Sequence, residues 1–218
     1  MLFAELPRAA PLPSGRRVRS LFSLLLLAAL GAGPVGATTD AERLIHEQAE
    51  LLKQGLAVSR AQAPHSADLE RLVTRIIAPH VDFNRFARLV LGKHWRRLSA
   101  EDRARFERGL AGLVIRTYST ALAGASGFDV EYLNAQPGRR PGRVVVPTVI
   151  RSAGNPPVKV SYKLYERQGV WRVYDVVIEG ISMAVNYRSV LAERIRRHGI
   201  DAVIDGLADV PAALTAGR

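Results

Sequence analysis

Residues 158–178 read VKVSYKLYERQGVWRVYDVVI, and this stretch determines the fold class. From Val158 to Leu164 every second residue is apolar, and the residues between them are polar. This alternation is typical of a strand with one buried face. The polar residues Glu166–Gly169 then lead into a second apolar run, Val170–Ile178. Two such runs joined by a short loop that contains glycine predict an antiparallel β-hairpin.

Two further strands are predicted before the hairpin. Phe128, Val130 and Tyr132 alternate with acidic residues, and Arg143–Ile150 is an almost continuous run of Val and Ile. Pro147 within that run indicates a bulge or a sheet edge, because proline has no N–H to donate to a neighbouring strand. Together with the hairpin, these segments predict four sequential strands.

The first half of the mature chain has the periodicity of helices instead. Apolar residues recur at spacings of three and four in segments that we expect to begin at Asp40, Ser66, Asp82 and Ser99. Asp and Ser favour helix N-termini, because their side chains accept hydrogen bonds from the first free backbone N–H groups. The helix that begins at Ser99 is expected to be the longest.

Helices followed by sequential strands predict an α+β fold. The helical N-terminal half is expected to pack on one face of a twisted, mostly antiparallel four-stranded sheet. A closing helical stretch, residues 184–207, is expected to complete the domain and to be split at Gly199.

Residues 1–37 predict a cleavable secretory signal peptide. Arginines precede the apolar stretch 21–30, and Val35–Ala37 supply the small residues of a cleavage site. This stretch is shorter than the roughly 20 residues needed to cross a bilayer, although an uncleaved N-terminal anchor is the alternative. The mature chain is expected to be one domain, residues 38–209, with a flexible tail, residues 210–218.

The charge of the chain points to anionic partners. Its 218 residues include 31 Lys and Arg, 20 Asp and Glu, and no Cys. Without the four Arg and one Glu of the signal peptide, 27 basic and 19 acidic residues remain, a formal charge of +8. A positive surface favours nucleic acid, an acidic protein or a lipid headgroup surface, and export makes nucleic acid the least expected of the three. The absence of Cys excludes thiol chemistry.

The sequence contains no motif for catalysis or metal binding. None of the five His residues lies three or four positions from another, and no nucleophile elbow, zinc-protease motif or phosphate loop occurs. Asp175 and Glu179 are the only carboxylates inside an apolar segment. They either form an acid/base pair or stabilise the fold by pairing with Arg188 or capping the turn at Gly180. We prefer the structural interpretation.

Two segments of the chain resemble a known family. The first is VDFNRFARLVLGKHWR, residues 81–96, continued by Ser99–Arg103 and Phe106. The second is WRVYDVVIEGIS, residues 171–182, followed by Asn186–Arg188. Both segments are similar to the MlaC family, periplasmic phospholipid-binding proteins that are also called toluene-tolerance proteins. The order of the elements, the signal peptide and the basic charge agree with this resemblance over nearly all of the mature chain.

The resemblance implies a soluble lipid shuttle in the periplasm, without enzymatic activity, metal or cofactor. Phospholipid would be its cargo, with the acyl chains in an apolar cavity between helices and sheet. Its partners would be an outer-membrane lipoprotein complex and an inner-membrane ABC transporter with a membrane-tethered ring protein. A monomer without a nucleic acid partner is expected.

The resemblance also suggests which residues line the cavity. Asn186, Tyr187 and Arg188 are expected either to hold the last helix on the sheet or to lie at the cavity mouth. The third helix would supply the wall, the fourth helix the roof and the strands the floor. In that order, the expected lining residues are Phe83, Phe86 and Val90; Leu110, Leu113, Val114 and Tyr118; and Val160, Tyr162, Leu164, Val173 and Val177.

Three alternative functions stay open on the sequence. The first is a carrier of the same fold for a hopanoid or another lipid. The second is a basic adaptor domain with a filled core and no lipid. The third is an enzyme on a cone-shaped α+β fold that uses Asp175 or Glu179 in a polar pocket.

Overall fold

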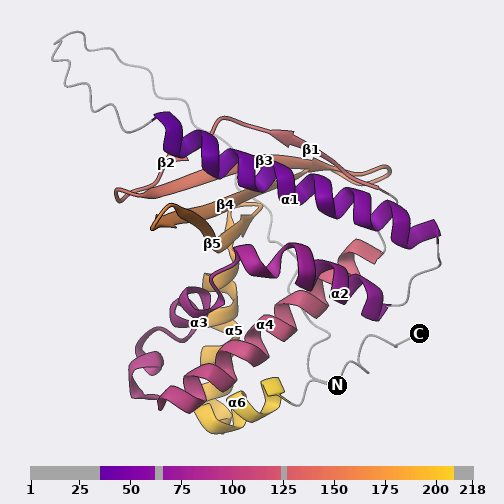
Figure 1. Cartoon of the computed structure of the whole chain (residues 1–218). Coiled ribbons are helices and arrows are strands. Elements are labelled where there is room, and N and C mark those ends of the chain that lie inside the picture. The colour runs from indigo at the N-terminus through magenta and orange to yellow at the C-terminus, as the bar shows by residue number, and fades with distance from the viewer. Residues whose placement is uncertain (1–34, 62–65, 124–126, 209–218) are drawn as a thin grey trace, which may run out of the picture. The chain divides into compact units, whose positions relative to one another are not determined.

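The structure, a computed structural model, describes residues 35–61, 66–123 and 127–208 (Figure 1). The apolar part of the predicted signal peptide and the predicted tail, residues 210–218, lie outside the described residues. No helix within the described ranges is long and apolar enough to span a membrane.

An antiparallel sheet follows the helical half of the chain, and the predicted α+β class is confirmed. The strand order is β1-β3-β4-β5-β6, and β2 also pairs with β3. The prediction of four strands is wrong in number, because β2 and β6, of two residues each, are too short to show a period. The described strands are β1 (Asp129–Tyr132), β2 (Gln136–Pro137), β3 (Arg143–Arg151), β4 (Val158–Arg167), β5 (Val170–Ile178) and β6 (Ile181–Ser182).

An irregularity in the β4–β5 hairpin decides which side chains of β5 face the helices. The register shifts between Lys163 and Leu164, so that β5 has one extra residue opposite β4. Tyr162 pairs with Val176, and both pack towards the helices, on what we call the inner face of the sheet. Because side chains alternate along a strand, Val177 lies on the opposite, outer face.

Pro147 lies in an interior strand, at a local gap in the pairing. β2 pairs with β3 before this proline, and β1 pairs with β3 only from Thr148 onwards. The Pro147 carbonyl accepts a hydrogen bond from Leu133 N at 3.0 Å on the β1 side, so its nitrogen faces the same side. Because neither β1 nor β2 pairs with β3 at Pro147, no strand needs a hydrogen bond from the N–H that proline lacks. The sheet therefore tolerates a proline at this position.

The helices agree with the predicted segments except at two points. α1 begins at Val35, so Asp40 lies inside the helix and the expected cleavage site falls in its first turn. α1 has 27 residues and α4 has 24, so the helix that follows Ser99 is not the longest one described. Gly199, with φ of 83°, separates the last two helices as predicted. The bounds are α1 (Val35–Ala61), α2 (Ser66–Ile76), α3 (Phe83–Leu91), α4 (Ala100–Ala123), α5 (Met183–His198) and α6 (Ile200–Ala208), with short 3-10 helices η1 (Ala78–His80) and η2 (Gly92–Arg97).

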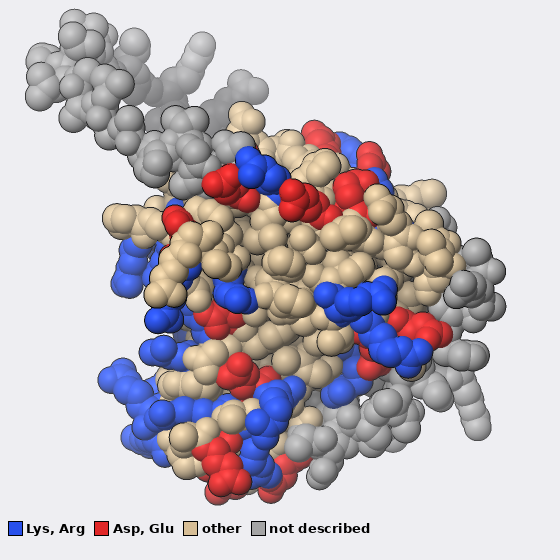
Figure 2. All heavy atoms as spheres, in the orientation of Figure 1, with Lys and Arg blue, Asp and Glu red and all other residues tan. Residues whose placement is uncertain are grey.

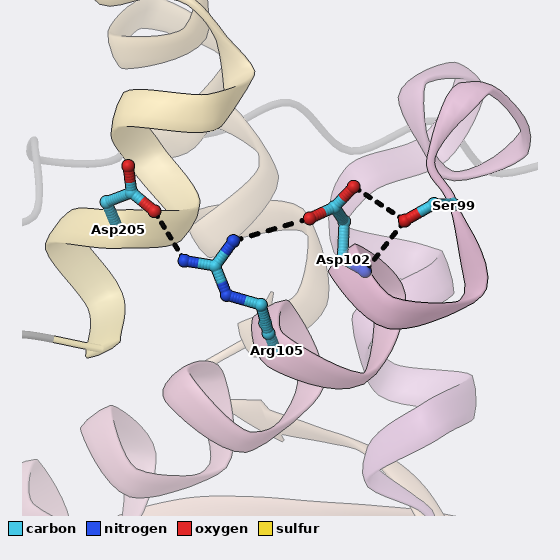
Figure 3. A network of polar contacts seen from close by, with 4 residues as sticks. All are labelled: Ser99, Asp102, Arg105 and Asp205. Carbon is cyan, nitrogen blue, oxygen red and sulfur yellow. Dashed lines mark hydrogen bonds and ion pairs between the residues drawn. The ribbon is translucent and has the colours of Figure 1, made fainter.

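Two predicted N-caps are confirmed. Asp82 Oδ1 accepts a hydrogen bond from the N–H three residues later at 2.8 Å. Ser99 Oγ accepts from Asp102 N at 3.0 Å and donates to Asp102 Oδ2 at 2.6 Å. Figure 3 shows that Arg105 joins this cap to α6, because its guanidinium contacts Asp102 and also Asp205, the latter at 2.6 Å. The start of α4 is thereby tied to the last helix.

Apolar side chains of the described residues gather in three clusters. The helical cluster joins α3, η2, α4, α5 and α6, and Phe106 and Leu110 at its centre are fully buried. The sheet cluster lies between α1 and the inner face, where Ala41 and Ile45 cover residues of β3, β4 and β5. The third cluster joins α1 and α2, and Ile115 of α4 packs against it.

Two glycines provide a matched test of packing in the helical cluster. A Cβ on Gly109 of α4 would lie 2.8 Å from Leu207 Cβ and 3.1 Å from its carbonyl carbon, whereas Gly206 of α6 has nothing within 4 Å. We predict that Gly109→Ala destabilises the protein by about 1–3 kcal/mol, because α4 and α6 must move apart. Gly206→Ala should stabilise it by about 0.5–1 kcal/mol, because alanine favours the helix. Urea unfolding measures both changes, and a stabilising Gly109→Ala would contradict this packing.

Candidate functional site

The helical cluster and the sheet cluster of the described residues meet at β5. Val176 of β5 packs against both clusters and keeps accessible surface. Tyr162 of β4 packs, partly buried, against the sheet cluster. Val114 and Tyr118 of α4 and Tyr187 of α5 pack, partly buried, against the helical cluster. We call these five residues the boundary site.

The tyrosines of the boundary site are surrounded by protein without being closed off. Burial raises the pKa of Tyr162 to about 12 and the pKa of Tyr187 to about 12, and it also raises the pKa of Tyr118. Each of these side chains nevertheless retains accessible surface. Partial burial with residual exposure places these phenols at the margins of the packed clusters, because a core residue is covered on all sides.

The helix residues expected to line a cavity fall into three groups in the structure. Val114 and Tyr118 lie at the margin of the helical cluster, as part of the boundary site. Phe83 belongs to none of the three clusters and lines a surface pocket with Val170. The others are buried inside the helical cluster and form the core behind the boundary site: Phe86, Val90, Leu110 and Leu113.

The strand residues expected to form the floor are divided by the register shift. Leu164 and Val173 are buried in the sheet cluster, which α1 covers. Val160 is buried on the inner face, and Tyr162 lies there at the boundary site. Val177 lies on the outer face, because the extra residue of β5 places it and Val173 on opposite sides.

Sequence reasoning missed Val176 as a member of the site. A regular strand that carries Val173 on one face would carry Val177, and not Val176, on the same face. The register shift reverses this assignment, and nothing in the spacing of apolar residues reveals it, since Val176 and Val177 are the same residue type. One signal was available, because a strict alternation from Val173 would place the charged Asp175 side chain on the same apolar face as Val173.

Tyr187 and Arg188 hold α5 mainly on another helix. Arg188 Nε donates to the carbonyl oxygen of Leu89 in α3 at 2.8 Å. The ring of Tyr187 meets that of Phe86 edge-on, with the centroids 6.1 Å apart. The expectation that these residues hold the helix on the sheet is therefore wrong for Arg188, and α5 is anchored on α3 instead.

Asp175 is what attaches α5 to the sheet. This carboxylate is 4% exposed and lies 2.9 Å from Lys163 Nζ. Ser182 Oγ donates to Asp175 Oδ2 at 2.7 Å, and the Ala184 N–H donates to Oδ1 at 3.1 Å. The sequence suggested either an ion pair with Arg188 or a cap at Gly180, and the observed ion-pair partner of Asp175 is Lys163. Glu179 accepts a hydrogen bond from the backbone N–H of Lys159, so both carboxylates are engaged in the fold.

The described residues form an α+β domain in which partly buried apolar and tyrosine side chains lie at the margins of the helical and sheet clusters. No group of three acidic or His side chains in the described ranges could hold a metal ion. The sequence profile described as MlaC protein matches residues 48–209, and the chain therefore belongs to the MlaC family.

Individual relatives agree with this assignment. The chain is 27% identical to toluene tolerance protein Ttg2D of Pseudomonas putida, over 85% of this chain and 87% of the relative. It is 23% identical to the intermembrane phospholipid transport system binding protein MlaC of Haemophilus influenzae, over 85% and 88% of the two chains. A phospholipid-binding protein of Ralstonia solanacearum, solved in complex with a phospholipid, has the same fold, with a TM-score of 0.72 and 24% identity over 81% of this chain and 99% of that one.

Removing the Asp175 carboxylate tests its structural role. We predict that Asp175→Ala lowers the free energy of unfolding by about 3 kcal/mol, because Lys163 and the N-terminus of α5 lose their buried partner. Glu131→Ala is the control, since its exposed ion pair with Arg151 is worth at most about 1 kcal/mol. Urea unfolding measures both variants, and equal losses would contradict this role.

A pH titration tests the burial of Tyr162. Its pKa of about 12 in the folded protein lies above the usual value of about 10, so the folded state holds the phenol proton more tightly than the unfolded state. The resulting stabilisation is complete below pH 10 and is lost as the pH rises from about 10 to about 12. We predict that Tyr162→Phe makes the decline in unfolding free energy over this range less steep. An unchanged slope would show that Tyr162 is solvated in the folded state.

Proposed function

We propose that this protein is a periplasmic lipid carrier that holds phospholipid acyl chains at the boundary site, between its helices and its sheet. The observation that carries this proposal is a set of apolar and tyrosine side chains that are only partly buried against the helical and sheet clusters. Two relatives support it, since one is described as an intermembrane phospholipid transport binding protein and another is solved with a phospholipid. Phospholipid is then cargo, and the proposed chemistry needs neither a catalytic residue nor a cofactor.

The size of the hydrophobic effect explains why such a carrier needs an enclosed site. Each buried methylene contributes about 0.8 kcal/mol, so a 16-carbon chain resists transfer into water by roughly 12 kcal/mol. Lipid therefore does not cross an aqueous compartment freely. For the same reason, the carrier cannot release its cargo into water and must pass it directly to another apolar site.

Direct transfer in turn requires docking partners on both sides of the periplasm. We propose an outer-membrane lipoprotein complex on one side and an inner-membrane ABC transporter with its membrane-tethered ring protein on the other. Signal-directed export and cleavage after Ala37 would deliver the carrier to the compartment between them. The formal charge of +8 on residues 38–218 would assist encounters with acidic surfaces.

The expected lining residues have different roles under this proposal. Val114, Tyr118 and Tyr162 contact the acyl chains, together with Val176 and Tyr187. Val160 supports the inner face beside them. The remaining inner-facing residues shape the space from behind, without contacting lipid: Phe86, Val90, Leu110, Leu113, Leu164 and Val173.

Two neighbouring valines of β5 provide a matched test. Val176→Trp adds bulk at the boundary site, whereas Val177→Trp adds the same bulk on the outer face. We predict that Val176→Trp co-purifies with about tenfold less lipid than the unaltered protein, because tryptophan occupies the space of the acyl chains. Val177→Trp should keep its lipid. The measurement is lipid extraction and mass analysis of residues 38–218, purified from the periplasm without detergent.

The same extraction identifies the cargo. Stoichiometric phospholipid supports the proposal, and a stoichiometric hopanoid would replace phospholipid as the cargo of the same site. A protein that carries no lipid and also takes none from liposomes would refute the carrier function and favour a basic adaptor domain. Equal lipid loss in both tryptophan variants would place the lipid elsewhere than the boundary site.

A further inference from the structure

A groove lined by arginines lies beside α3, outside the boundary site. It has a volume of about 780 Å³, and its walls come from α3, η2 and β4. Lys and Arg gather in Figure 2 along the side of the molecule where Figure 1 draws α3. We call this feature the arginine groove and define it by four cationic and two apolar lining residues: Arg85, Arg88, Arg96, Arg167, Leu89 and Trp95.

Neighbouring side chains do not neutralise the charge of the arginine groove. None of its four arginines forms an ion pair with a carboxylate of the described residues. Asp82 is the one carboxylate in the described lining, and both of its oxygens are engaged. Its Oδ1 caps α3, and its Oδ2 accepts a hydrogen bond from the hydroxyl of Tyr165. The groove therefore presents an excess of positive charge to a ligand.

The walls of the arginine groove are held in place by contacts of their own. The guanidinium of Arg85 lies 4.2 Å from the ring centroid of Tyr165 and 5.0 Å from that of Tyr174. Arg103 donates hydrogen bonds to two carbonyl oxygens of η2, at 2.9 and 3.2 Å. A ligand would thus meet the Arg85 guanidinium and the η2 backbone already in position, which lowers the entropic cost of binding there.

We propose that the arginine groove binds an acidic segment of a partner protein, with carboxylates on both sides of an apolar side chain. Carboxylates match the forked donors of arginine and form charge-assisted hydrogen bonds with them. The apolar lining from Leu89 and Trp95 fits the apolar side chain of such a segment. A lone phosphate would leave that lining uncovered, and a flat bilayer surface does not follow a concave wall.

The arginine groove and the boundary site are connected through α3. Arg85 and Arg88 of this helix line the groove, whereas Phe86 and Val90 are buried in the helical cluster. A partner segment in the groove would therefore bind the helix whose other face supports the lipid site. This consequence rests on the proposed carrier function, whereas binding in the groove does not depend on it.

The test uses a fluorescent peptide, Glu-Leu-Glu-Glu-Leu-Glu, and its uncharged counterpart Gln-Leu-Gln-Gln-Leu-Gln. Fluorescence anisotropy measures their binding to residues 38–218. The double variant Arg88→Glu/Arg96→Glu changes the groove, and Arg139→Glu/Arg140→Glu makes the same charge change on an exposed turn. We predict that the groove variant binds the acidic peptide about tenfold or more weakly, while the turn variant stays within about twofold of the unaltered protein.

The outcomes distinguish this proposal from its competitors. Equal losses in both double variants would overturn it, because they would reflect net charge alone. Equally strong binding of the uncharged peptide would also overturn it. A further contrary outcome is that the unaltered protein binds phosphatidylglycerol vesicles, the groove variant does not, and the acidic peptide fails to displace the vesicles. Lipid extraction from the same variants separates the two functions. A groove variant that keeps its lipid and loses peptide binding supports the groove as the docking site. Unchanged peptide binding in the groove variant overturns the groove, even if that variant has lost its lipid.

Discussion

The attachment of α5 to the sheet through Asp175 is the constraint on which the rest of the domain depends. A buried carboxylate is stable only where its charge and its hydrogen-bonding capacity are satisfied. Here Lys163 of β4, Ser182 before α5 and the first turn of α5 satisfy it together. Another position of α5 would leave Asp175 with Lys163 but without the hydrogen bonds from Ser182 and from the Ala184 N–H. The polar contact therefore fixes a helix–sheet orientation that non-directional apolar packing alone would leave loosely defined.

The position of α5 then determines that of α3. Arg188 and Tyr187 of α5 hold α3 through the carbonyl of Leu89 and the ring of Phe86. From its other end, α3 is held to the hairpin, because Asp82 also accepts a hydrogen bond from Tyr165. α3 is thus fixed between α5 and the β4–β5 hairpin. In this position it has one face in the helical cluster and the other in the arginine groove.

Much of this architecture could be predicted from the sequence, because periodicity and capping are local properties. The caps at Asp82 and Ser99, the break at Gly199 and the β4–β5 hairpin follow from neighbouring residue types alone. The boundary site could be predicted only in part, because its composition depends on pairing between strands. Because β5 has one extra residue, Val176 and not Val177 lies on the inner face, and the sequence does not distinguish them because both are valine. Three arginines of the groove lie within residues 85–96, but Arg167 of β4 is distant in the chain, so the local sequence does not show that these elements form one groove.

Polar and apolar contacts have separate roles in this domain, and this separation fits the proposed carrier function. Apolar contacts that hold a lipid are worth roughly 12 kcal/mol for one 16-carbon chain, comparable to the 5–15 kcal/mol stability of a whole domain. If the same apolar contacts also held the helices on the sheet, removal of the lipid would remove a large part of the stability of the fold. In this protein, polar contacts outside the boundary site tie α5 to the sheet through Asp175, α5 to α3 through Arg188, and α4 to α6 through the cap network around Asp102. Such an arrangement allows the lipid to leave while the scaffold, and with it the arginine groove, keeps its geometry for the next docking event.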